Sequence, residues 1–183
     1  MKTPLIPTLL FSLASVIPCV HAADVQSKID STYTSLGITD CQIREENANE
    51  GWSKSVCPGV ADYKLNLTEG DLRQSLDVVD PQGKVHPLNF SSTVSGGFSA
   101  LGQKAEWRVQ KKAGKTLPIA MIVRFNVSED PVHSEKTTSY LVVSKITPTS
   151  ICVTDVVKPS KTANQQARDL ADTAATRECK KVS

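Results

Sequence analysis

The chain has 183 residues, of which 39% are hydrophobic and 22% charged, and its formal net charge is +2. These proportions exclude a disordered tail and a bundle of membrane helices. The near balance of charge also excludes the strongly basic face of a typical nucleic-acid-binding protein, so no nucleic-acid partner is expected.

The first 22 residues resemble a secretory signal. Lys2 supplies the positive start, the segment from Leu5 to Val20 is mainly apolar, and Ala22 ends a small-x-small cleavage pattern. The apolar stretch is about 16 residues long, shorter than the roughly 20 residues of a spanning helix. We therefore expect residues 1–22 to be a cleaved signal peptide and residues 23–183 to form a single α+β domain, periplasmic or secreted, with no membrane span after cleavage.

A lipoprotein anchor at Cys19 is the alternative reading of the leader. Such an anchor requires a small residue before the cysteine, and Pro18 stands there instead.

Four cysteines remain after cleavage: Cys41, Cys57, Cys152 and Cys179. An even number of cysteines in an exported chain indicates disulfides, and four cysteines allow three connectivities. We favour Cys41–Cys57 and Cys152–Cys179 because the members of each pair are close in sequence. A zinc site is the rival reading, but the chain has no Cys-x-x-Cys and no histidine lies near any of these four cysteines, so we expect no metal and no cofactor.

The first element predicted after the leader is a short helix. Val25, Ile29, Tyr33 and Leu36 recur at helical spacing, and Gly37 follows as a stop signal. Such an amphipathic helix would cover one side of a sheet.

Strands are predicted through the centre of the chain. The segment 41–57 is expected to form a strand, an exposed acidic loop at 45–50 and a returning strand, and the period-two pattern of residues 63–67 predicts a half-buried strand. Asp80 to Gly83 has the residue types of a β-turn, and Pro87 favours an edge strand after it. Residues 91–102 are rich in Ser and Gly, so we expect a flexible loop there.

The last third of the chain contains the most apolar strand. Residues 119–127 include five consecutive apolar residues, which predicts a central strand buried on both faces. A hairpin of residues 140–146 and 151–157 follows, and residues 162–180 form a helix with a stripe of alanines. The predicted fold is therefore α+β, with a mostly antiparallel, curled sheet of six to seven strands flanked by an N-terminal and a C-terminal helix.

The sequence contains no recognisable catalytic motif. Nucleotide-binding loops, the His-Glu-x-x-His motif and a Gly-x-Ser-x-Gly elbow are all absent. His86 and His133 lie in polar surroundings and are interpreted as surface residues. Enzyme activity is therefore left open, and no catalytic residue is assigned; a pair of carboxylates is the one catalytic arrangement that this composition still permits.

One group of charged residues is a candidate site. Arg124 follows the apolar run 119–123, and an arginine within a central strand is costly unless it is paired, so we expect a partner such as Glu106. Arg73, Arg108 and Arg124, with Glu106, could form an anion or ligand site. The alternative is a salt-bridge ladder that only holds the sheet. The acidic loop 45–50, closed by the first disulfide, could also serve as a binding tip.

Several segments together resemble a loose group of uncharacterised, signal-bearing bacterial periplasmic or secreted proteins. They are Trp52, Val56-Cys57-Pro58-Gly59, Asp71-Leu72-Arg73-Gln74-Ser75, Glu106-Trp107-Arg108 and the strand from Pro118 to Arg124. A cysteine-bearing strand and an Ala-rich helix with the last cysteine complete the resemblance. It covers most of the mature chain, implies a periplasmic address and implies no activity.

The sequence thus predicts an exported, non-catalytic binding protein of the bacterial envelope, such as an inhibitor of a hydrolase or an envelope-maintenance factor. Its partner would be another envelope or secreted protein, and the chain itself would be a monomer. The alternatives are a small periplasmic hydrolase that uses carboxylates and a purely structural exported domain.

Overall fold

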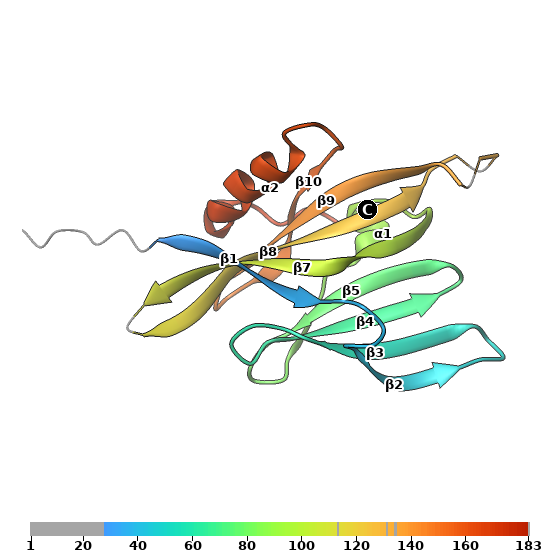
Figure 1. Cartoon of the computed structure of the whole chain (residues 1–183), viewed down its shortest axis with the longest axis horizontal. Coiled ribbons are helices and arrows are strands. Elements are labelled where there is room, and N and C mark those ends of the chain that lie inside the picture. The colour runs from blue at the N-terminus through green and yellow to red at the C-terminus, as the bar shows by residue number, and fades with distance from the viewer. Residues whose placement is uncertain (1–27, 113, 131, 134, 183) are drawn as a thin grey trace, which may run out of the picture.

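The computed structural model of the chain describes residues 28–182 except 113, 131 and 134. The predicted signal peptide, residues 1–22, and Val25 of the predicted helix lie outside these residues. Ten strands are described, in one curled and unclosed sheet (Figure 1). They are β1 (Ile29–Ser35), β2 (Gln42–Asn47), β3 (Trp52–Pro58), β4 (Lys64–Gly70), β5 (Arg73–Val79), β6 (Val85–Pro87), β7 (Phe98–Lys112), β8 (Lys115–Ser128), β9 (Thr137–Ile146) and β10 (Ile151–Val157).

The sheet consists of two antiparallel arms. The strand order is β10-β9-β8-β7-β5-β4-β3-β2, with β1 paired to β7 and β6 paired to β5. The junction is the one parallel contact among the described residues, between Arg73 of β5 and Ser99 of β7. We call β2–β6 the N-terminal arm, and β1 with β7–β10 the C-terminal arm. The main core lies between the arms, where Trp107 and Phe125 meet Leu65 and Leu76.

Strand β8 is central, and it is buried on both faces from Ala120 to Val123. The burial predicted for residues 119–127 is therefore confirmed only in part, because Arg124 is exposed. Met121 and Val123 face the main core, while Ala120 and Ile122 lie under helix α2 (Ala163–Asp172). Because neither face of this part of the strand meets water, its residues need not alternate between apolar and polar. Four alanines of the predicted stripe (Ala163, Ala167, Ala171 and Ala174) pack on this second cluster.

The predicted N-terminal helix is wrong. Residues Ile29–Ser35 form β1, which pairs antiparallel with β7. Tyr33, counted as part of an apolar helical face, is half exposed, and Thr34 Oγ1 accepts a hydrogen bond from Trp107 Nε1 at 2.9 Å. Ser, Thr and Tyr dominate this segment, and the β-branched and aromatic ones favour a strand once an open edge is available.

The predicted number of strands is also wrong. The sheet contains ten described strands rather than six to seven, partly because β1 was assigned to a helix. The predicted flexible loop at 91–102 instead contains most of the short helix α1 (Phe90–Thr93) and the start of β7. The curled and mostly antiparallel character of the sheet is confirmed.

The C-terminal helix is shorter than predicted. Helix α2 ends at Asp172, a short 3₁₀ helix η1 (Ala174–Thr176) follows, and the chain continues in extended form from Arg177. The side chain of Thr173 contacts the carbonyl oxygens of Asp169 and Leu170 at 3.1 and 3.2 Å, a local bonding pattern that competes with a regular helix.

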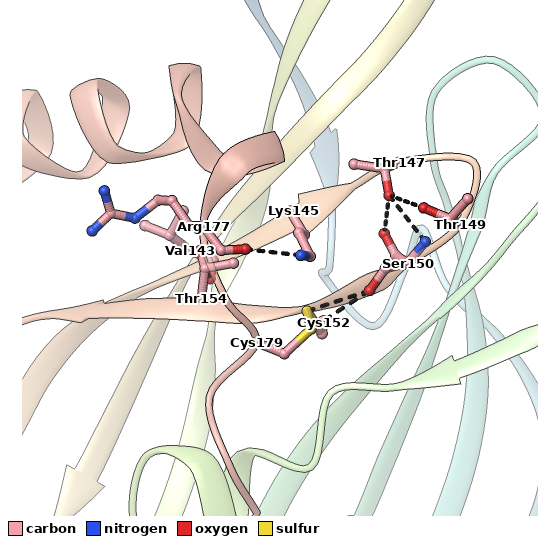
Figure 2. Close-up of a disulfide and its surroundings, with 9 residues drawn as sticks. All are labelled: Val143, Lys145, Thr147, Thr149, Ser150, Cys152, Thr154, Arg177 and Cys179. Atoms are coloured by element: carbon pink, nitrogen blue, oxygen red, sulfur yellow. Dashed lines mark hydrogen bonds between the residues drawn. A yellow bond between two sulfur atoms is a disulfide. The ribbon is translucent and has the colours of Figure 1, made fainter.

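The C-terminal tail is fixed to the sheet by covalent and polar contacts. Cys179 forms a disulfide with Cys152 of β10, and Arg177 contacts both carboxylate oxygens of Asp155 at 2.6 and 2.7 Å. Figure 2 shows Lys145 reaching the carbonyl oxygen of Arg177, at 2.8 Å, and Ser150 beside both sulfur atoms. The other disulfide joins Cys41 to Cys57, so both disulfides connect the pairs that sequence proximity favoured.

Candidate functional site

Two residues of the predicted site lie in a row of ion pairs between β7 and α2. Glu106 and Arg108 project from the outer face of β7, because Trp107 between them points into the core. Arg168 of α2 contacts Glu106 through two nitrogens, at 2.6 and 3.2 Å. Asp172, one helical turn later, accepts two hydrogen bonds from Arg108, at 2.6 and 2.8 Å. Two ion pairs therefore connect the helix to β7, and we call them the α2 ion-pair row.

Strand β1 completes this row from the other side. Ser31 lies opposite Arg108 in the strand register, and Tyr33 lies opposite Glu106. The Ser31 hydroxyl donates to Glu106 at 2.6 Å and accepts a hydrogen bond from Arg108. A strand that the sequence had suggested to be a helix thus supplies two polar groups to the row.

The pKa values in the row favour the charged forms. Burial alone would raise the pKa of Glu106, but hydrogen bonds from Arg168 and Ser31, together with the charge of Arg168, lower it below its usual value. Hydrogen bonding to Glu106 raises the pKa of Arg168, and hydrogen bonding to Asp172 raises that of Arg108. These groups remain ionised at neutral pH and hold one another in place.

The guanidinium of Arg108 is fully used in contacts within the protein. Arg108 is only 8% exposed, and its three guanidinium nitrogens all have partners in Asp172 and Ser31. A ligand would have to displace one of these contacts to reach it. Arg108 and Glu106 therefore match the ladder interpretation better than the ligand interpretation.

Arg124 occupies a different environment from the one expected. It is exposed, it does not pair with Glu106, and its Nη1 donates to the Ser139 hydroxyl at 2.8 Å. It lies on the same strand face as Ile122, but Ile122 is covered by α2 and Arg124 is not. Val123 and Phe125, the neighbours of Arg124 in sequence, face the main core on the opposite side of the strand. They show that the strand is central, but they do not show whether the side that carries Arg124 is covered.

Arg73 lies at the junction of the two arms, apart from the other predicted residues. Its Nη1 pairs with Asp71, its Nε donates to the Gly96 carbonyl oxygen at 2.9 Å, and its guanidinium lies 4.9 Å from the centre of the Phe98 ring. The three arginines of the predicted anion site therefore do not converge.

A cleft beside α2 brings together Arg124 and Glu106 with residues that the sequence analysis did not select. Lys104 of β7, Asn164 and Arg168 of α2 line it, and its volume is about 240 Å³. The one sequence feature that could have pointed to Arg168 is its spacing of four residues from Asp172 within one helix. It predicts a pair within the helix, whereas each residue pairs with the sheet instead.

A second hollow lies at the mouth of the curled sheet, where the two arms diverge. Leu36, Leu67 and Leu101 line it together with the more exposed Ile38 and Ile43, and its volume is about 270 Å³. We call it the mouth groove. Cys41, also in its lining, ties the turn that carries Ile38 to β3 through Cys57.

Acidic groups lie beside the mouth groove. Glu69 lines it, and Glu46 and Glu69 both line the adjoining hollow at the tip of the β2–β3 hairpin, next to Trp52. The N-terminal arm, residues 42–87, carries eight Asp and Glu against five Lys and Arg, whereas the C-terminal arm, residues 29–35 and 98–157, carries six against eight. The loop predicted at 45–50 is wrong in part, because Glu45 and Glu46 lie in β2 and only residues 48–51 form the turn. This acidic segment belongs to an arm with an excess of acidic residues, whereas the C-terminal arm has a small excess of basic ones.

Another hollow, of about 350 Å³, lies on the outer face of the N-terminal arm and contains Glu45, Lys54 and Asp77. Burial raises the pKa of Asp77 above its usual value, although a hydrogen bond from the Leu88 backbone opposes the shift. Glu45 is ion-paired with Lys54 at 2.9 Å.

The described residues contain no group of three or more His, Cys, Asp or Glu side chains placed to hold a metal ion. Two histidines lie next to carboxylates: His86 contacts Asp80 and His133 contacts Asp130, each at 2.9 Å.

Across residues 28–182, apart from the three gaps, no helix has the length and apolar character needed to cross a membrane. Comparison of the chain with protein families, curated proteins and solved structures finds no match.

Proposed function

We propose that the chain is an exported, non-catalytic binding protein of the bacterial envelope, and that its partner, another envelope or secreted protein, docks in the mouth groove. The observation that carries the proposal is the pair of exposed isoleucines on the groove, Ile38 at 79% and Ile43 at 47% exposure. Exposed apolar residues that lie together and are rimmed by polar groups mark surfaces where one protein binds another.

The groove is held in shape without a ligand. The Cys41–Cys57 disulfide fixes the turn that bears Ile38. Gln74 donates to Glu69 at 3.0 Å and accepts a hydrogen bond from the Leu101 backbone N–H at 2.7 Å, so the opposite wall is also tied together. A rigid groove loses little conformational entropy when it binds, which favours affinity.

The groove and its acidic surroundings define the chemistry of the partner. An apolar side chain would fill the space between Ile38, Ile43 and Leu67, and flanking Lys or Arg residues would lie near Glu46 and Glu69. Two disulfides suit a protein that works in an oxidising compartment. Inhibition of a hydrolase and envelope maintenance are both roles that such binding would serve.

Photo-crosslinking tests this proposal in living cells. A photoreactive phenylalanine analogue at position 38 or 43 is expected to crosslink one envelope or secreted protein. The same analogue at position 117 should not, although Leu117 is an exposed apolar residue of comparable size. The purified partner should then bind Ile43→Ser about tenfold more weakly than the wild type, and Leu117→Ser equally well. Equal crosslinking at all three positions, or none, would reject the mouth groove as the binding site.

A small hydrolase that uses carboxylates is the second candidate, and Asp77 is the observation that favours it. A carboxyl group with a raised pKa is suited to act as a general acid, and Glu45 lines the same hollow. Release of sugars from purified bacterial cell walls, abolished by Asp77→Asn and by Glu45→Gln, would support this candidate. No release by the wild-type protein would count against it.

A further inference from the structure

The cleft beside α2 has an excess of positive charge. Lys104, Arg124 and Arg168 line it, and Glu106 is its one acidic residue. Both carboxylate oxygens of Glu106 are bonded to Arg168, and Arg108 lies 4.0 Å from one of them. The negative charge of Glu106 is therefore shared by two arginines that lie against it, and it is not available to neutralise Lys104 or Arg124.

Lys104 and Arg124 form no ion pair with any residue that the structure describes. Arg124 has one hydrogen-bond partner there, the neutral hydroxyl of Ser139, and Lys104 is exposed. Two cationic side chains on neighbouring strands thus face one cleft with most of their donors unused. Their mutual repulsion is unfavourable, and a bound anion would remove it.

The backbone holds Arg124 close to β7. A Cβ atom on Gly102 would lie 2.8 Å from the Cβ of Arg124, closer than two such atoms can approach. The absence of a side chain at position 102 therefore lets the stem of Arg124 lie against β7, near Lys104. Gly102 is a positioning residue for the guanidinium.

We propose that this cleft binds a small dianion, either a phosphate group or a dicarboxylate, through Lys104 and Arg124. A dianion matches the two cations that lack an internal partner. A guanidinium binds such oxyanions through two parallel hydrogen bonds, and Asn164 in the lining adds a neutral donor. The volume of about 240 Å³ suits a small metabolite or the charged group of a larger molecule.

This site lies on the outer face of the C-terminal arm, and the mouth groove lies where the arms diverge. The two sites have no lining residue in common. Failure of one proposal would therefore leave the other standing.

Nuclear magnetic resonance titration at constant ionic strength tests the inference, with inorganic phosphate and succinate as separate probes and chloride as the reference. At pH 7.5, where both probes are mainly dianions, we expect saturable shifts of the Arg124 Nε–H and of backbone amides near Lys104. Saturation by phosphate alone would identify a phosphate site, and saturation by succinate alone a carboxylate site. Shifts that fail to saturate with both probes, or that chloride reproduces, would overturn the proposal.

Matched variants separate a specific site from general attraction between charges. Arg124→Gln and Lys104→Gln should each weaken binding about tenfold, because each removes charge-assisted hydrogen bonds. Arg44→Gln removes another exposed arginine, from the N-terminal arm, and should change binding less than about twofold. Equal weakening by Arg44→Gln and Arg124→Gln would contradict the proposal.

A further variant tests how Arg124 is positioned. Gly102→Ala keeps every charge but displaces the stem of Arg124, so it should weaken anion binding several-fold. A thermal melt of the same variant measures its stability separately from its affinity. Unchanged affinity in a folded Gly102→Ala protein would show that Arg124 is not held by this contact.

Discussion

The substitution Asp172→Ala should destabilise the protein far more than the loss of an average ion pair. Arg108 is buried, and Asp172 occupies two of its three guanidinium nitrogens. Removal of the carboxylate leaves the charge with the Ser31 hydroxyl and with Glu106 at 4.0 Å, which Arg168 already binds. The guanidinium then lacks a counter-charge of its own in a site that water barely reaches.

The magnitude follows from how deeply the pair is buried. Breaking a fully buried ion pair by removing one partner costs about 3–5 kcal/mol. The side chain of Asp172 is 29% exposed, and a negative charge at the end of a helix is slightly unfavourable, so both effects reduce the cost. We expect Asp172→Ala to lower the free energy of unfolding by about 2–3 kcal/mol. The double variant Arg108→Met, Asp172→Leu should stay within about 1 kcal/mol of the wild type, because it removes both charges and keeps the volume.

Urea unfolding with the disulfides intact measures these differences. Trp107 is fully buried and reports the loss of the core, and a Trp52→Phe background removes the other tryptophan of the chain. Glu45→Ala is the control, since it breaks an exposed pair with Lys54 and should cost no more than about 0.5 kcal/mol. The reasoning is refuted if Asp172→Ala costs no more than Glu45→Ala, or if the double variant is less stable than Asp172→Ala.

The pKa shifts and the disulfides give three more predictions. The pKa of Glu106 is lowered in the folded state. Its ionised form therefore stabilises the fold above the unfolded-state pKa of about 4.3, and this stabilisation is lost as the pH falls through the folded-state pKa. Denaturation curves should therefore show Glu106→Gln less stable than the wild type at pH 7, by a margin that shrinks below pH ~4. The pKa of Asp77 is raised in the folded state, so the sign is reversed: Asp77→Asn should gain stability relative to the wild type as the pH rises from ~3.5 to ~7. Removing the Cys152–Cys179 disulfide should cost about 3.5 kcal/mol and removing Cys41–Cys57 about 3 kcal/mol, because the closed loops span 27 and 16 residues; the reverse order in calorimetry would contradict the loop argument.

Patterns of burial predicted the C-terminal arm well. The alternation around Trp107, the apolar run at 119–123 and the alanine stripe of α2 each follow from which faces are covered. Both disulfides could also be predicted, because short loops favour local pairing. β1 could not, since four apolar residues at helical spacing outweighed the strand preference of Ser, Thr and Tyr, and the edge that β1 pairs with lies far away in sequence.

The candidate site was predicted only in part. An arginine beside apolar residues indicates that its strand is buried, but it does not indicate where a covering helix ends. The extent of α2 determines what each residue does: the helix covers Ile122, leaves Arg124 exposed and places Arg168 beside Glu106. The register between a helix and the sheet beneath it depends on tertiary packing, which a single sequence does not encode in any local pattern.

The pairing of β1 with β7 sets the order in which this chain can fold. β2, β3, β4 and β5 each pair with a neighbour in sequence and can form hairpins as soon as they are synthesised. β1 has to wait, because Ser31 and its partner Glu106 are 75 residues apart. Closure of the molecule around β1 and α2 is therefore a late and slow event. Until β7 has been made, β1 therefore has no strand to pair with, and the fold cannot close before more than half of the chain is present.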